Sequence, residues 1–144
     1  MIASVPDRTN HFRNKAFAAL LASVAGAVGA NRVYLGQRLW WLPPALTAAT
    51  LPFLLGVANW YQTAPFFLLM VPVVAGFIQA LVIALMPDDR FDAQFNARHA
   101  RRNRSGWAAV LVAIATLLGG GVVLVSTIAL ATQTYFENAL RATQ

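Results

Sequence analysis

The chain has 144 residues, of which 58% are hydrophobic and only 11% are charged. Soluble domains carry about 25% charged residues, so this composition predicts one helical domain in a membrane. The absence of cysteine excludes disulfides, thiolate catalysis and cysteine-bound metals. The net charge of +6 does not predict a nucleic-acid partner, because the basic residues flank apolar segments and there fit topology signals and contacts with anionic lipid head groups.

A polar tail, residues 1–14, precedes the first apolar segment, residues 16–30, which lies between Lys15 and Arg32. A helix needs about 20 apolar residues to cross a bilayer, so this segment is short. Three interpretations remain open: a full crossing, a re-entrant segment or a cleaved signal peptide. The uninterrupted apolar sequence favours the full crossing.

The second apolar segment covers residues 39–58 and begins at Trp40 and Trp41, which are typical of the head-group level. Pro43 and Pro44 suit a first helical turn, and an internal proline, Pro52, predicts a kink. A short uncharged connection follows, and the third segment covers residues 66–86 within the region 59–86.

The longest polar connection is residues 87–106, with aspartates first and arginines last, an order that suits the dipole of a helix. We expect a short helix on the membrane surface over residues 89–103; an irregular loop is the alternative. Four side chains there are candidates for contact with anionic lipid: Arg98, Arg101, Arg102 and Arg104. A fourth membrane helix over residues 107–131 and a tail, residues 132–144, complete the expected bundle of about four transmembrane helices.

The charge distribution predicts which side is cytoplasmic. Loops 31–38 and 87–106 carry lysine or arginine and the connection between them carries none, so both loops are expected in the cytoplasm. Four full crossings put the N-terminal tail on the opposite side. A re-entrant first segment instead puts ten of the eleven basic residues inside.

Residues 13–22 (RNKAFAALLA) and 26–36 (GAVGANRVYLG) resemble the TM2-domain family of bacterial membrane proteins. The resemblance covers about a third of the chain and implies a helix pair over residues 15–58, joined by a short cytoplasmic turn. Two positions depart from the family pattern: Asn31 replaces His or Asp, and Val33 replaces Phe. The family supplies no enzymatic activity. The turn motif comprises Asn31, Arg32, Tyr34 and Gly36.

Small residues recur every four positions along the first segment. Such a stripe lets helix backbones approach closely in lipid, against a helix of the same chain or of a neighbouring copy. The candidate packing residues are Ala18, Ala22, Gly26, Gly29 and Ala30.

No group of residues in the sequence predicts a catalytic site or a metal site. The sequence has no phosphate-binding loop and no nucleophile–base pair, so we expect no catalytic residue, no metal, no cofactor and no enzymatic activity. Gln79 predicts a hydrogen bond between helices, with a pore-lining role as the alternative. We therefore expect a non-enzymatic module of the bacterial inner membrane that packs against itself or another membrane protein. The alternative is a small oligomeric pore, transporter or holin-like subunit.

Overall fold

The computed structural model describes residues 11–144, and every regular element in that range is a helix, which confirms the all-α fold. The α-helices are α1 (Lys15–Ala25), α2 (Ala30–Leu35), α3 (Leu42–Thr50), α4 (Ala64–Leu85), α5 (Asp88–Phe95) and α6 (Gly106–Ala142). Short 3-10 turns are η1 (Gly26–Val28), η2 (Leu51–Leu54) and η3 (Trp60–Gln62). Most of the expected N-terminal tail, residues 1–10, lies outside the described residues.

Within residues 11–144, two helices are long and apolar enough to cross a membrane, α4 with 22 residues and α6 with 37. The prediction of four transmembrane helices is therefore wrong. The first and second apolar segments form the shorter helices Lys15–Val28 and Leu42–Leu54. At 1.5 Å per residue, each falls short of the roughly 30 Å of a hydrocarbon core.

Backbone conformation at two glycines explains why the first segment is interrupted. Gly29 has φ 70° and ends η1, and Gly36 has φ 67° and ends α2. A left-handed conformation suits glycine and reverses the chain. The expected turn over residues 31–38 is consequently half helical, because α2 occupies residues 30–35. The amino end of α1 is fixed by Asn14, whose side chain accepts a hydrogen bond from Phe17 N–H.

The second segment ends early at its internal proline. Helix α3 starts at Leu42 with prolines in its first turn, as expected for residues that lack an N–H. Instead of a kink at Pro52, the helix tightens into η2 and then ends at the extended residue Leu55. Pro52 cannot donate the hydrogen bond that would continue the α-helix. By contrast, α4 continues through the buried Pro72.

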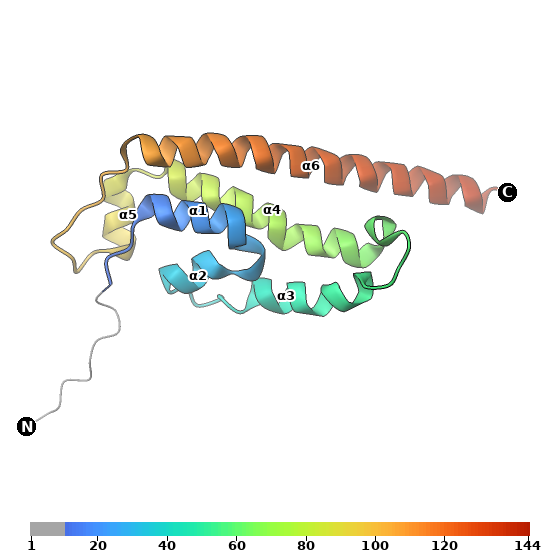
Figure 1. The fold of residues 1–144 in the computed structure, drawn as a ribbon, viewed down its shortest axis with the longest axis horizontal. Helices are drawn as coiled ribbons and strands as arrows, with labels where there is room; N and C mark the ends of the chain where they lie inside the picture. Colours follow the sequence, from blue (N-terminus) through green and yellow to red (C-terminus); the bar gives the residue numbers. More distant parts are fainter. Residues whose placement is uncertain (1–10) are drawn as a thin grey trace, which may run out of the picture.

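Helices α1 and α3 lie one after the other along α4 (Figure 1). Helix α1 lies along the C-terminal half of α4, where Gly26 meets Gly76, and α3 lies along its N-terminal half. Helix α2 turns back toward the start of α1, where Tyr34 Oη accepts a hydrogen bond of 2.9 Å from Asn14 N. Helix α6 packs against α4 and α1, on the side away from α2 and α3, and extends past the end of the bundle.

The two remaining polar segments also differ from their expected bounds. Helix α5 stops at Phe95 rather than continuing to residue 103, because the side chain of Asn96 is used in a network described below. Helix α6 continues through the expected tail to Ala142. Its 37 residues give a length of about 55 Å, against about 33 Å for α4.

One end of the bundle collects most of the charge. It contains the start of α1, all of α5 and the start of α6 (Figure 1). We call it the basic end and define it by these residues: Arg13, Lys15, Arg90, Arg98, Arg101, Arg102 and Arg104. Arg141 lies at the opposite end of α6.

Candidate functional site

A buried carboxylate organises the basic end. Asp92 is 1% exposed and lies on the inner face of α5. It accepts hydrogen bonds from Asn96 Nδ2 at 2.8 Å and from the backbone N–H of Asn103 at 2.6 Å, and a further one from Asn103 Nδ2. Burial raises the pKa of Asp92, but these hydrogen bonds outweigh burial and lower the pKa below its usual value. Asp92 therefore acts as the anionic centre that shapes loop 96–105.

A second carboxylate joins three elements. Asp88 forms an ion pair of 2.8 Å with Lys15 Nζ at the start of α1, and it accepts hydrogen bonds from the backbone N–H and the hydroxyl of Ser105. Burial raises the pKa of Asp88, but the bonds from Lys15 and Ser105 and the charge of Lys15 lower it from 3.8 to about 2. The carboxylate thus holds α1, α5 and the start of α6 together.

The chain just before α1 is bound by two asparagines. Arg13 N donates to Asn96 Oδ1 at 2.9 Å, and Asn96 Nδ2 donates to Arg13 O at 2.9 Å. Lys15 N donates to Asn103 Oδ1 at 3.1 Å. The Arg13 side chain donates to the carbonyls of Tyr34 and Phe95. These bonds place the N-terminal segment, the end of α2 and α5 at the same end of the molecule.

This network, which we call the aspartate network, comprises Arg13, Lys15, Asp88, Asp92, Asn96, Asn103 and Ser105. Each of its carboxylate oxygens accepts at least one hydrogen bond from a donor of the same chain. Within residues 11–144, no three His, Cys, Asp or Glu side chains are grouped to hold a metal ion. The network is a structural clamp.

Sequence reasoning missed this clamp. The prediction that the aspartates at the start of residues 87–106 suit a helix start describes Asp88 in the first turn of α5 but not the buried Asp92. The spacing Asp88, Asp92, Asn96 is a signal that could have placed three polar side chains on one helix face. Asn103 has no such signal, since its loop is irregular.

The four candidate arginines all lie within loop 96–105. Arg101, Arg102 and Arg104 line a polar cavity of about 330 Å³ between the starts of α1 and α6. Arg98 lines a neighbouring depression together with Arg13 and His99. Arg101 lies over the ring of Phe12, with its guanidinium carbon 4.7 Å from the ring centroid.

The candidate packing residues lie between α1 and α4. Ala18 and Ala22 are fully buried, and a Cβ on Gly26 would lie 2.5 Å from Gly76 Cα. Gly29 is buried against the start of α3, where a Cβ would lie 2.8 Å from Trp40 O, and Ala30 is half-buried. The partner of the stripe in this structure is thus a helix of the same chain.

The turn-motif residues serve internal contacts in α2. Asn31 is 1% exposed and donates from Nδ2 to Gln79 Oε1 at 2.9 Å. Tyr34 bonds Asn14 as described above, and Arg32 Nη1 donates to Leu39 O at 3.4 Å. A Cβ on Gly36 would lie 2.9 Å from Arg13 Nη2. The motif therefore holds α2 against α1 and the segment before it, and Asn31 joins α2 to α4.

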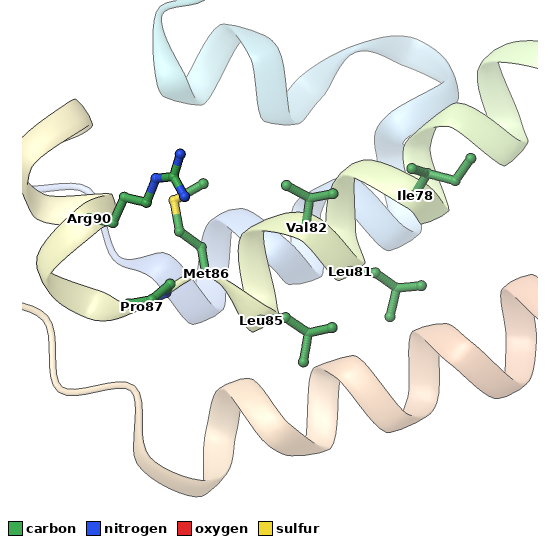
Figure 2. Close-up of a pocket in the computed structure, with 7 residues that line it drawn as sticks. All are labelled: Ile78, Leu81, Val82, Leu85, Met86, Pro87 and Arg90. Atoms are coloured by element: carbon green, nitrogen blue, oxygen red, sulfur yellow. The ribbon is translucent and has the colours of Figure 1, made fainter.

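An apolar groove follows the outer side of α4 to its junction with α5. Figure 2 shows the side chains that line it, with Met86 and Arg90 close together at one end. Its volume is about 450 Å³, and Arg90 is the one charged residue in its lining. No residue in this lining has the chemistry of a catalytic acid, base or nucleophile. The lining residues are Ile78, Leu81, Val82, Leu85, Met86, Pro87 and Arg90.

Comparisons with protein-family models, with curated proteins and with solved structures give no match to this chain. The likeness of residues 13–36 to the TM2-domain family stays a prediction.

Proposed function

We propose that this chain is a multi-pass protein of a bacterial inner membrane that acts without enzymatic activity, as a packing and interaction module. Exposed apolar surface on α6 is the observation that carries the proposal. Contact between such an apolar surface and water is unfavourable, whereas lipid or a neighbouring helix can cover the surface. Large side chains that are at least 60% exposed along α6 include Trp107, Leu111, Leu118, Val122 and Val125.

Three crossings fit this geometry. Helices α1 and α3 together form one broken crossing, α4 forms the second and α6 the third. Irregular backbone at membrane depth is tolerated where protein buries it, and here the break at Gly29 is buried between α3 and its neighbours. The basic end then faces the cytoplasm, with the N-terminal segment on the same side as residues 87–106. This arrangement corresponds to the re-entrant alternative of the sequence analysis.

The pore alternative has less support. Gln79, the polar residue in the C-terminal half of α4, bonds Asn31 inside the chain. Thr116, in the N-terminal third of α6, is 3% exposed on the face that packs within the bundle. A water-filled path needs polar side chains that face an opening, and these two face the interior of the chain.

Site-specific photo-crosslinking in intact membranes tests the interaction role. We expect benzoylphenylalanine in place of Leu118, which is 67% exposed on α6, to form a covalent adduct of defined mass with a second polypeptide. The matched control is Val71, which is 57% exposed on α4. An interaction through α6 gives a protein adduct at Leu118 and lipid adducts at Val71. Lipid adducts at both positions would contradict the proposed role.

A further inference from the structure

A cavity at the basic end has walls suited to an anion. It lies where the segment before α1, the end of loop 96–105 and the first turn of α6 meet. Its volume of about 330 Å³ exceeds that of a phosphate group, and its lining is rich in nitrogen donors. The lining residues are Phe12, Asn14, Ala16, Arg101, Arg102, Asn103, Arg104, Ser105 and Ala108.

Two of the three arginines in this cavity, Arg101 and Arg104, form no ion pair with the described residues. The ion pair found in residues 11–144 joins Lys15 to Asp88. Arg104 makes no hydrogen bond or ion pair in that range, and Arg101 contacts only the ring of Phe12. Arg102 lies near Asp92, whose oxygens are already occupied by asparagine donors. The guanidinium groups therefore keep their donors for a ligand.

The aspartate network holds in place the part of the cavity wall formed by residues 103–105. Asn103 is held by Asp92 and Ser105 by Asp88, and these two residues flank Arg104 in the sequence. A loop whose backbone is fixed loses less entropy when it binds a ligand. The start of α6 adds the positive end of a long helix dipole to the same place.

We propose that this cavity binds a phosphate group, carried by the head group of an anionic phospholipid. Arginine forms paired hydrogen bonds with phosphate oxygens, which explains a cluster of arginines at this position. The membrane source rests on the topology under Proposed function, because that topology places the cavity at the lipid head groups. The exposed Trp107 in the first turn of α6 is typical of that level.

Native mass spectrometry of the full chain in detergent tests the proposal, with dioleoylphosphatidylglycerol and dioleoylphosphatidylcholine as probes. We expect the wild type to retain phosphatidylglycerol in preference to phosphatidylcholine. The double variant Arg101→Gln, Arg104→Gln should bind phosphatidylglycerol about tenfold more weakly, a change of about 1.4 kcal/mol. The matched control is Arg38→Gln, Arg90→Gln, which removes the same charge outside the cavity and should retain near wild-type binding.

A second variant separates the cavity from charge. Ala108 is exposed at the cavity wall, so Ala108→Trp should fill the cavity, keep the net charge and still weaken lipid binding. Wild-type binding by Ala108→Trp, or an equal loss in the control pair, overturns the proposal. Displacement of the lipid by inorganic phosphate overturns the lipid source. If the chain needs detergent for extraction yet retains no lipid, this inference fails while the membrane placement stands.

Discussion

Replacing Gly26 with alanine is expected to lower the free energy of unfolding by about 1–3 kcal/mol, because one added methyl overpacks a rigid contact. The new Cβ would lie 2.5 Å from Gly76 Cα, a backbone atom that cannot rotate away. Helices α1 and α4 must therefore separate, which also disturbs the buried Ala22 one turn earlier. Unfolding in detergent, followed by circular dichroism, measures the effect.

The matched control for this change is Gly121→Ala. Gly121 also lies inside a helix, α6, and nothing lies within 4 Å of its added Cβ. Alanine favours a helix over glycine by about 1 kcal/mol, so the control should be neutral or stabilising. If both variants changed stability equally, the close approach of α1 and α4 would lose its support.

Replacing Asp92 with alanine is expected to cost about 3 kcal/mol or more. The change leaves the backbone N–H of Asn103 buried without its acceptor and removes one of the two acceptors of the side-chain amide in each of Asn96 and Asn103. A buried polar group without a partner costs about 1–3 kcal/mol. We expect loop 96–105 to detach from the segment before α1, because both asparagines also bind Arg13 or Lys15. Limited proteolysis of the loop, alongside chemical unfolding, reports this release.

Asp89→Ala provides the comparison for Asp92→Ala. Asp89 is exposed on the same helix, and its replacement removes the same charge. We therefore expect the free energy of unfolding to fall only by the helix-dipole contribution, about 0.3–1 kcal/mol. Equal losses for the two variants would mean that the buried carboxylate adds nothing beyond its charge.

The long apolar helices follow from the sequence because length and hydropathy alone determine them. Helix α4 covers residues 64–85 against an expected 66–86, and the start of α6 lies one residue from its expected position. The prolines at the start of α3 behave as local chemistry predicts. Such features depend on neighbours in the chain and are readable without a fold.

The broken crossing does not follow from the sequence in the same way. Residues 16–30 have the composition of a membrane helix, and a positive φ at Gly29 depends on the packing of α2 and α3 around it. Similarly, the hydrogen bond between Lys15 and Asn103 joins positions 88 residues apart in the chain. An irregular loop has no periodicity from which such a contact can be inferred.

Labelling of single cysteines on both sides of the membrane tests the three-crossing account most directly. The chain has no native cysteine, so His11→Cys, Gln94→Cys and Thr143→Cys each introduce one exposed thiol. A membrane-impermeant maleimide, applied to sealed vesicles of either orientation, is expected to label positions 11 and 94 from the same side and position 143 from the other. Labelling of positions 11 and 143 from one side, with position 94 opposite, would contradict the account and restore four full crossings.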